Sequence, residues 1–328
     1  MARQLSVRIE RFPIAGRFTI ARGSRTEAVV VTVAIRDRDA VGRGECVPYA
    51  RYGESVEGVA AAIEGLRPIV EEGLTRFDLQ AALPAGAARN ALDCALWDLD
   101  AKLTGVPVHV AAGIDRLSAV TTAYTISLGT PAEMAEAAAK AAARPILKIK
   151  LGAPEGDEAR IEAVRRAAPD STLIADANEG WSAEHLRRHL DACAAAGFAL
   201  IEQPVRAEAD DILANLARGV PICADESLHD RAGLERLRGR YEAINIKLDK
   251  AGGLTEALAL AAEARRLGFT IMIGCMLGSS LSMAPALLLA PMARFVDLDG
   301  PLLLARDREP GLLYEGSIVR PASPALWG

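Results

Sequence analysis

Two lysines lie inside a short apolar segment, "ILKIKLG" at residues 146–152. Lys148 and Lys150 are two positions apart, so a β-strand would direct both side chains to the same face of its sheet. Burying two ammonium groups side by side is unfavourable unless negatively charged groups lie opposite them. The segment therefore predicts a buried, charged site with acidic partners.

Charged residues also end the apolar segments that follow along the chain. From Lys150 to Lys247, successive charges are 22 to 26 residues apart, about the length of one strand–helix unit. Parallel strands in such units present their carboxyl ends at one edge, so we expect the charges to surround one site. The residues concerned are Lys148, Lys150, Asp176, Glu202, Asp225, Lys247, Asp297 and Asp299.

Three consecutive units would bring together the carboxylates of Asp176, Glu202 and Asp225. They could not all stay ionised without a cation between them, and an all-oxygen ligand set favours Mg²⁺ over zinc. Lys148 and Lys150, on the strand before that of Asp176, would lie on one side of the cation, and Lys247, on the strand after that of Asp225, on the other. A substrate carboxylate bridging the metal would then have its α-carbon between opposed amines. This arrangement suits removal of a proton from one face and its return to the other.

Each of these features has a simpler interpretation when taken alone. A Lys-x-Lys pair in a strand is most often solvated, and an acid after a strand, such as Asp225 in "ADES", often caps a helix. The segment "DLDGP" at 297–301 is typical of a turn. "KAGG" at 250–253 could cradle a phosphate, but more simply begins a helix. These residues favour catalysis only when taken together, because a charge recurs at the end of each successive strand–helix unit.

The elements that must position these residues begin near residue 121. Eight short apolar or β-branched segments alternate with alanine- and arginine-rich amphipathic segments. This alternation predicts βαβ units around a parallel sheet, in an α/β fold of the (β/α)8 barrel type. An open doubly wound sheet is the alternative, but no Gly-x-Gly-x-x-Gly follows a strand.

The first 115 residues have a different pattern. Strand-like segments at 4–15 and 28–37 precede helical segments at 55–73 and 87–105, which predicts an α+β domain. We expect this domain to span 1–115 and to be completed by a proline-punctuated tail, 304–328. The barrel would then occupy 116–303.

Composition excludes several classes of protein. With 328 residues, 51% of them hydrophobic, the chain can form a sizeable core. A net charge of −5 and the lack of a basic stripe argue against a nucleic-acid partner. No segment is long and apolar enough for a membrane span or a signal peptide. Five scattered cysteines are typical of reduced thiols, so we expect a cytoplasmic enzyme acting on a small molecule.

Several motifs together resemble a known family. "ILKIKLG", "ADANEGW", "IEQP", "ADES", "NIKLDKAGGLTEA" and "GCMLGSS" are similar to segments of the bacterial L-Ala-D/L-Glu (dipeptide) epimerases, in the muconate-lactonizing subgroup of the enolase superfamily. Residues 16–55 resemble that family's capping domain and its two substrate-covering loops. The resemblance implies a modified (β/α)7β TIM-type barrel with an N-terminal α+β capping domain. It also implies a Mg²⁺ cofactor, a dipeptide substrate, a role in murein peptide recycling and a possible homo-oligomer.

The resemblance also implies a role for each charged residue. Asp176, Glu202 and Asp225 match the magnesium ligands, and Lys150 and Lys247 match the acid/base pair on opposite faces of the substrate. Lys148 matches the lysine that positions the substrate carboxylate and lowers the ammonium pKa of its neighbour. Asp297 and Asp299 match the acids that hold the α-amino group of the dipeptide.

Alternatives remain open at this stage. Arg22 and Arg25 in "IARGSRTEA" lie on an expected lid and could pair with a substrate γ-carboxylate, or be surface residues. An o-succinylbenzoate synthase, N-succinylamino acid racemase or cycloisomerase would share the lysines and the metal but would not need paired acids. The mandelate racemase branch uses a histidine that "GCMLGSS" lacks. A Schiff-base aldolase would use one buried lysine and no set of metal-binding acids.

Overall fold

The computed structural model describes residues 3–153, 155–214 and 216–328. Its N-terminal unit is an antiparallel sheet in the order β1-β2-β3, covered on one face by helices. Val31, Val33 and Ile35 on β2 are fully buried, as expected for alternate residues on the core face of a strand. The elements of this unit are β1 (Gln4–Ile20), β2 (Gly23–Asp37), β3 (Ala40–Cys46), η1 (Ala50–Tyr52), α1 (Val56–Gly65), α2 (Arg67–Glu72), α3 (Arg76–Ala82), α4 (Ala87–Thr104) and α5 (Val108–Ala111).

Helix α4 packs unusually close to β3. A Cβ atom on Gly42 would overlap the carbonyl oxygen of Ala95, and one on Gly44 would overlap that of Ala91. Glycine at both positions therefore lets the helix backbone lie directly on the strand. Because α4 has the sheet on one side and the barrel on the other, it buries polar side chains as well as apolar ones.

The second unit is a curled sheet of eight parallel strands, in which each strand pairs with its successor in the chain. The expected parallel α/β barrel is thus confirmed, with a strand at each of the eight predicted segments. Leu147 and Ile149 on β6 pack outward against the helices, whereas Lys148 and Lys150 lie on the other face. The strands are β5 (Tyr124–Ile126), β6 (Ile146–Lys150), β7 (Thr172–Asp176), β8 (Leu200–Glu202), β9 (Ile222–Ala224), β10 (Ala243–Ile246), β11 (Thr270–Ile273) and β12 (Phe295–Val296).

The helices of the barrel connect its strands. Thr130 caps α6 with a reciprocal capping box to Glu133, and Ser182 caps α8, which fixes where these helices begin. The shorter connections use 3-10 helices. The elements are α6 (Pro131–Lys140), α7 (Asp157–Ala167), α8 (Ala183–Ala195), η2 (Ala207–Leu213), η3 (Arg231–Gly233), α9 (Leu234–Leu237), α10 (Leu248–Ala251), α11 (Leu254–Arg266), α12 (Ser280–Ala286), η4 (Leu287–Met292) and α13 (Gly300–Leu303).

The first and last barrel strands meet without a strand ladder among the described residues. Single hydrogen bonds join them instead. Ala123 N donates to Val296 O at 2.8 Å, and Leu298 N donates to Thr122 Oγ1 at 2.8 Å. At the upper end, Thr125 N donates to Asp299 Oδ2 at 2.7 Å. The seam therefore depends in part on a side chain that the sequence assigns to substrate binding.

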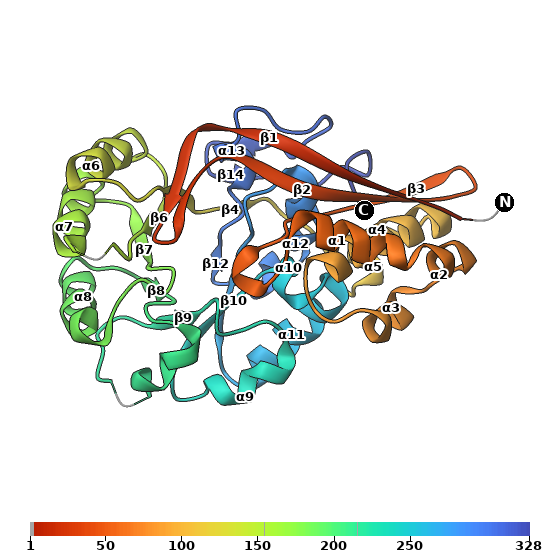
Figure 1. Ribbon diagram of the computed structural model, residues 1–328. Helices are drawn as coiled ribbons and strands as arrows, with labels where there is room; N and C mark the ends of the chain where they lie inside the picture. The colour runs from red at the N-terminus through yellow and green to blue at the C-terminus, as the bar shows by residue number, and fades with distance from the viewer. Residues whose placement is uncertain (1–2, 154, 215) are drawn as a thin grey trace.

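The β1–β2 hairpin is longer than the predicted strands and reaches over the barrel (Figure 1). Its register shifts between Pro13 and Phe18, where the arm bends. Beyond the bend the arm contacts the barrel, since Leu128 N donates to Thr19 O at 2.9 Å. The hairpin tip thereby places residues 20–25 over the carboxyl ends of the strands.

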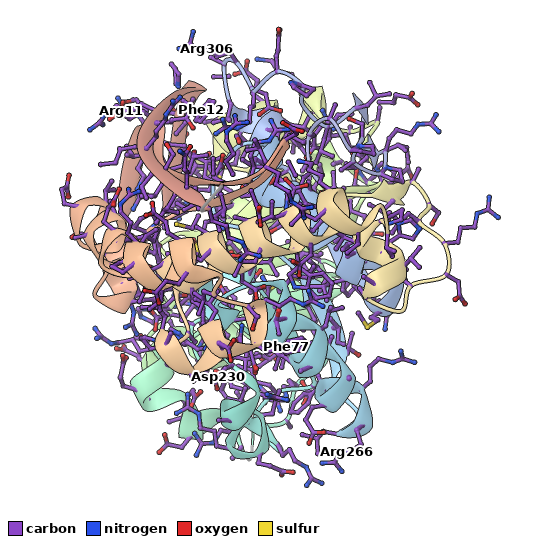
Figure 2. The ribbon with its side chains drawn as sticks, turned by 90° about the vertical axis from the view of Figure 1, so that its right-hand side faces the viewer. Arg11, Phe12, Phe77, Asp230, Arg266 and Arg306 are labelled. Carbon is purple, nitrogen blue, oxygen red and sulfur yellow. The ribbon has the colours of Figure 1, made fainter. Side chains whose placement is uncertain are left out.

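The tail contacts both units. Leu304 bridges to Ile14, Trp327 Nε1 donates to Cys94 O at 3.0 Å, and β13 (Tyr314–Glu315) and β14 (Ile318–Val319) form a small sheet with β4 (Val120–Thr121). In Figure 2, α4 is the long pale-orange helix that crosses the middle of the view. Within the described ranges, the helices are too short or too polar to cross a membrane.

Candidate active site

Lys150, Asp176 and Glu202 lie side by side at the carboxyl ends of β6, β7 and β8. The strand register pairs Lys150 with Asp176 and Asp176 with Glu202. Lys150 Nζ donates to Asp176 Oδ2 at 2.7 Å. Burial alone would raise the pKa of Asp176, but Lys150 and Lys148 outweigh it and hold that pKa well below its usual range. Asp176 is therefore an ionised carboxylate inside the protein.

Lys148 is the ammonium group at the centre of the acids. Its Nζ lies 3.1 Å from Asp176 Oδ2, 2.7 Å from Glu202 Oε2 and 2.7 Å from Asp297 Oδ2. Burial disfavours the charge, but these three carboxylates outweigh burial and raise the Lys148 pKa well above its usual value. Glu202 is less well compensated, and burial next to Asp176 raises its pKa to about 7. Acids do lie opposite the buried lysines, as the sequence predicts.

The third acid, Asp225, follows β9 and binds two further lysines. Lys247 Nζ donates to Asp225 Oδ2 at 2.7 Å, and Lys250 Nζ donates to Asp225 Oδ1 at 2.6 Å. Burial disfavours the ionised form of Asp225, but the two ammonium groups hold its pKa well below the usual value. Asp225 in turn raises the pKa of Lys247 despite burial, so Lys247 is held as an ammonium ion.

Asp297 and Asp299 lie close together beyond β12, and their side chains have different partners. Asp297 Oδ2 pairs with Lys148, and its Oδ1 is buried without a hydrogen-bond partner. Asp299 Oδ2 accepts the backbone N–H of Thr125. Burial and the neighbouring Asp297 raise the Asp299 pKa to about 7. Asp297 thus has an unsatisfied buried acceptor, whereas one oxygen of Asp299 belongs to the barrel seam.

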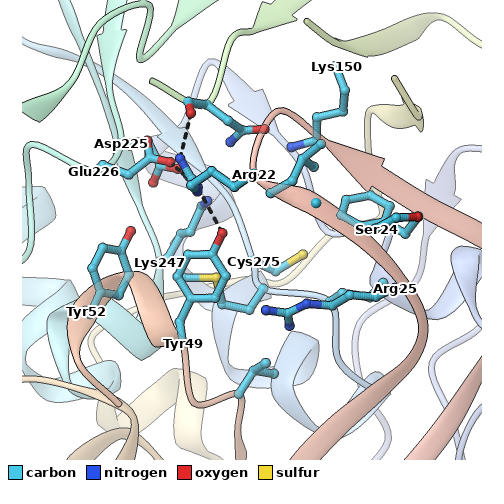
Figure 3. A pocket seen from close by; sticks show the side chains of 17 residues that line it. Arg22, Ser24, Arg25, Tyr49, Tyr52, Lys150, Asp225, Glu226, Lys247 and Cys275 are labelled. Atoms are coloured by element: carbon cyan, nitrogen blue, oxygen red, sulfur yellow. Dashed lines mark hydrogen bonds and ion pairs between the residues drawn. The ribbon is translucent and has the colours of Figure 1, made fainter. Parts of the chain in front are cut away.

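A cavity of about 220 Å³ lies between this rim and the β1–β2 hairpin (Figure 3). Lys150 and Lys247 both line it, as do Asp225 and Glu226. Its other walls come from the hairpin and from the segments after β3 and β11, including Phe18, Val47, Tyr49, Tyr52, Cys275 and Met276. Both predicted acid/base lysines therefore face one cavity large enough for a small substrate.

Arg22 crosses the mouth of this cavity, where its side chain has several partners. Its guanidinium donates to Glu226 Oε1 at 2.6 Å, to Tyr49 Oη at 2.9 Å and to Asn178 O at 2.6 Å. Burial disfavours the charge, but Glu226 and Tyr49 raise the Arg22 pKa above its usual value. Arg22 therefore fastens the hairpin tip to the loops after β7 and β9.

Arg25 has a different environment, although it lies only three residues away. In the described part of the chain, its guanidinium makes no hydrogen bond or ion pair, and it lies 5.6 Å from the centre of the Tyr49 ring. Figure 3 shows it beside the same cavity, away from the bonds that join Arg22 to Glu226. Of the two predicted substrate-binding arginines, Arg25 is the one available to a ligand.

Comparison with known families assigns the chain to a superfamily. Residues 132–303 match the model described as enolase C-terminal domain-like, and residues 2–113 match the N-terminal domain of mandelate racemase / muconate lactonizing enzyme. The chain belongs to the enolase superfamily. The resemblance read from the sequence motifs is thereby confirmed, as is the combination of a capping domain with a barrel.

Individual enolase-superfamily relatives are similar over nearly the whole chain. The L-Ala-D/L-Glu epimerase of Escherichia coli (strain K12) is 51% identical over 314 residues, 95% of this chain and 98% of that protein. An N-acetyl-D-glutamate racemase of Pseudoalteromonas sp is 45% identical, over 91% of this chain and 95% of that protein.

Two solved structures of enolase-superfamily members contain dipeptides. One, from Agrobacterium tumefaciens, has homology to dipeptide epimerases and holds sodium and L-Ala-L-Glu. It has a TM-score of 0.98 and 57% identity, covering 99% of this chain and 100% of that one. A dipeptide epimerase from Methylococcus capsulatus, with Mg and L-Arg-D-Lys, has a TM-score of 0.86 and 33% identity, covering 98% of each chain.

The acids of this superfamily member fit a divalent cation by charge. Glu226 pairs with Arg22, and the remaining five acids lie among four lysines (Asp176, Glu202, Asp225, Asp297 and Asp299 against Lys148, Lys150, Lys247 and Lys250). Burial raises the pKa values of Glu202 and Asp299 to about 7, and a divalent cation beside them would favour their ionised forms. Glu202 Oε2 is buried 2.7 Å from Lys148 Nζ, and a carboxylate oxygen keeps a second lone pair with which it could coordinate a cation.

The geometry of the acids differs from the simple expectation of three converging ligands. Among the described residues, no three acidic, histidine or cysteine side chains enclose a metal position as they stand. Each predicted ligand is instead directed at an ammonium group: Asp176 at Lys150, Glu202 at Lys148, and Asp225 at Lys247. A cation binding here would have to replace or share these ion pairs.

The sequence interpretation missed four buried residues that position the site. Asn245 Nδ2 donates to Glu202 Oε1 at 2.7 Å, and Gln203 Oε1 accepts Asp225 N at 2.9 Å. Lys250 Nζ donates a hydrogen bond to Asp225 Oδ1, and Glu226 Oε1 accepts one from the guanidinium of Arg22. Asn245 could have been found, because it is a polar residue two positions before Lys247 in an apolar strand and shares its face. The other three depend on contacts between separate loops.

Proposed function

We propose that this protein is a magnesium-dependent dipeptide epimerase, an isomerase that moves the α-proton of the C-terminal residue in substrates such as L-Ala-D/L-Glu. The observation that carries the proposal is that Lys150 and Lys247 line one cavity while pairing with different acids, Asp176 and Asp225. Two amines fixed on opposite sides of one space are what a 1,1-proton transfer requires. The similarity to the epimerase of Escherichia coli supports the same activity.

The roles of the chain's own residues follow from their surroundings. Lys150 would remove the α-proton from one face, and Lys247, which Asp225 holds as the ammonium ion, would return a proton to the other face. Lys148, fully enclosed by acids, positions the substrate carboxylate through its charge. A magnesium ion held by Asp176, Glu202 and Asp225 would stabilise the negative charge that develops on that carboxylate.

The two ends of the dipeptide have separate candidate partners. The buried, unpartnered Oδ1 of Asp297 would accept the N-terminal ammonium group, with Asp299 beside it. The unpaired guanidinium of Arg25 would bind the γ-carboxylate of a C-terminal glutamate. A role in murein peptide recycling and a cytoplasmic location fit this substrate and stay predictions.

A second candidate substrate is an N-acylated glutamate, because a similar protein of Pseudoalteromonas sp is an N-acetyl-D-glutamate racemase. Such a substrate shares the γ-carboxylate but has no ammonium group to satisfy Asp297. The test is to incubate the enzyme and Mg²⁺ in deuterated water with L-Ala-L-Glu, N-acetyl-L-glutamate, N-succinylamino acids or muconate, and to follow the α-proton by NMR. Exchange of the glutamyl α-proton in the dipeptide supports the proposal. Exchange confined to N-acylated amino acids, or lactonisation of muconate, contradicts it.

A further inference from the structure

The segment after Lys247 lies along one face of helix α4 in the capping domain. Arg89 Nη2 donates to Ala251 O at 2.7 Å, Thr255 N donates to Asp93 Oδ2 at 2.9 Å, and Trp97 Nε1 donates to Thr255 Oγ1 at 2.9 Å. The three α4 residues are four positions apart and so share a helix face. This face follows the barrel segment 251–255 for its whole length.

Two glycines make this close approach possible. Gly252 and Gly253 have φ angles of +80° and +112°, and a Cβ on either would overlap the side chain of Arg89 or Asp93. Gly252 ends α10 and Gly253 precedes α11, as expected for a helix-entry turn. The space around "KAGG" is filled by α4 side chains, so the alternative of a phosphate cradle is not supported.

Asp249 extends the contact to the wall of the cavity. Its Oδ1 accepts two hydrogen bonds, from Val47 N at 2.9 Å and from Asn90 Nδ2 at 2.9 Å. All three groups are buried, and Val47 lines the cavity. One oxygen atom on the turn after Lys247 thereby joins that turn to α4 and to a wall of the cavity.

Lys247 depends on this turn for its backbone position. It follows the last residue of β10 and caps α10, which is a single turn of four residues. Ala251 N donates to Lys247 O at 3.0 Å, so the turn anchored at Asp249 closes on the lysine's own carbonyl. A helix of one turn is not stable by itself, so its position must come from what it packs against.

We propose that Asp249 and Asn90 are positioning residues for Lys247, through which the capping domain fixes the amine that acts on one face of the substrate. The inference rests on the proposed two-base epimerisation. Lys150 is the internal control. It is carried by β6 and held by Asp176, and its side chain forms no hydrogen bond or ion pair with Asp249 in the described part of the chain, so its reaction should not depend on this anchor.

The test measures exchange of the α-proton in deuterated water separately for L-Ala-L-Glu and L-Ala-D-Glu, because each lysine serves one epimer. Lys247→Ala first identifies the epimer that depends on Lys247. Asp249→Ala and Asn90→Ala should then slow exchange of that epimer by about 10- to 100-fold, the cost of misplacing a reacting group by about 1 Å. Exchange of the other epimer should stay within about threefold of the wild-type rate.

Asp249→Asn is the matched control. Its amide oxygen can still accept both hydrogen bonds, so both epimers should exchange at nearly the wild-type rate. If Asp249→Ala does not fold, Asn90→Ala is the deciding variant, because it removes only one of the two hydrogen bonds to Asp249. It should likewise slow only the epimer that depends on Lys247.

Three results would overturn the inference. One is equal slowing of both epimers, which a purely structural role would cause. Another is an Asp249→Asn enzyme as impaired as Asp249→Ala. The third is a wild-type enzyme that exchanges neither epimer, which would overturn the proposed function as well.

Discussion

Lys148 Nζ lies 2.7 Å from Asp297 Oδ2, so one buried ion pair joins the predicted metal-binding acids to the predicted ammonium-binding acid. The same Nζ contacts Glu202 and Asp176. Lys148 therefore contributes positive charge both to the proposed metal site and to the proposed site for the substrate ammonium group. Replacing Lys148 should affect both sites together.

Lys148→Met should destabilise the metal-free protein by about 3–5 kcal/mol, because removing one partner of a buried ion pair leaves uncompensated carboxylates. The measurement is urea unfolding of chelated protein. Added Mg²⁺ should stabilise Lys148→Met more than the wild type, since the cation supplies the missing positive charge. Lys140→Met, which removes an exposed ion pair with Glu136, is the control and should change little. Equal stability of Lys148→Met and wild type without metal would contradict this account of the cluster.

Asp297→Asn should lower kcat/KM for L-Ala-L-Glu by about 10- to 100-fold, because a charge-assisted hydrogen bond contributes about 1.5–3 kcal/mol. Its free Oδ1 is the acceptor that a substrate ammonium would occupy. Any residual activity on N-acetyl-L-glutamate should be unaffected or improved, because that substrate brings no ammonium. Steady-state kinetics with both substrates make the comparison. A loss of the same size for both would mean that Asp297 acts on something other than the ammonium group.

Arg25→Ala should raise KM for L-Ala-L-Glu by about 10- to 100-fold while leaving an apolar substrate such as L-Ala-L-Leu nearly unchanged. The γ-carboxylate is the only group that the unpaired guanidinium would recognise. Arg22→Ala is the matched comparison. Because Arg22 is bound to Glu226 and Tyr49, its loss should impair both dipeptides alike by loosening the hairpin tip. If Arg22→Ala instead raised KM only for L-Ala-L-Glu, Arg22 and not Arg25 would be the residue that binds the γ-carboxylate, which would contradict this prediction.

The sequence predicted which charged residues lie at the strand ends, but not which groups their side chains bind. Eight strand segments and the spacing from Lys150 to Lys247 located the rim, because a repeated βα unit brings strand ends to one edge. Two contacts lay beyond this pattern. Asp299 bonds Thr125 N across 174 residues, and Arg22 bonds Glu226 across 204. Such pairs arise only when the barrel closes and the hairpin folds over it, and no local periodicity encodes them.

The sequence pattern also did not predict how far the β1–β2 hairpin extends. Residues 16–27 lie between the two predicted strand segments and resemble part of a substrate-covering loop, yet most of them continue β1 and β2. Backbone pairing within the arm and contact with the barrel stabilise them in place of a core face. The two arginines proposed to bind the substrate lie there, which is why the choice between Arg22 and Arg25 needed the structure.

Stability of the chelated protein should fall as pH rises from about 5 to 8. Burial raises the pKa values of Asp249 and Asp299 to about 7 in the folded state, above their value of 3.8 in a model compound. In that window the native state binds more protons than the unfolded state. The stabilisation is therefore fully present below the unfolded pKa and is lost as pH passes the folded one.

Melting temperatures of chelated protein across this pH range provide the measurement. Asp249→Asn mimics the protonated acid, so it should flatten the pH dependence and melt higher than wild type at pH 8. A wild-type protein whose stability rises from pH 5 to 8 would show that these carboxyls are ionised in the folded state.

The central claim, proton transfer between two lysines, is tested most directly by the isotope content of the first product. The wild-type enzyme with Mg²⁺ would convert L-Ala-L-Glu to L-Ala-D-Glu in deuterated water, sampled at low conversion by NMR. Two separate lysines, each exchanging with solvent, predict product deuterated at the glutamyl α-carbon while most unreacted substrate still carries protium. Lys150→Ala and Lys247→Ala should each abolish conversion, while each still exchanges the α-proton of one epimer. Product that retains the substrate's own proton, or a Lys247→Ala enzyme that epimerises at the wild-type rate, would contradict the account.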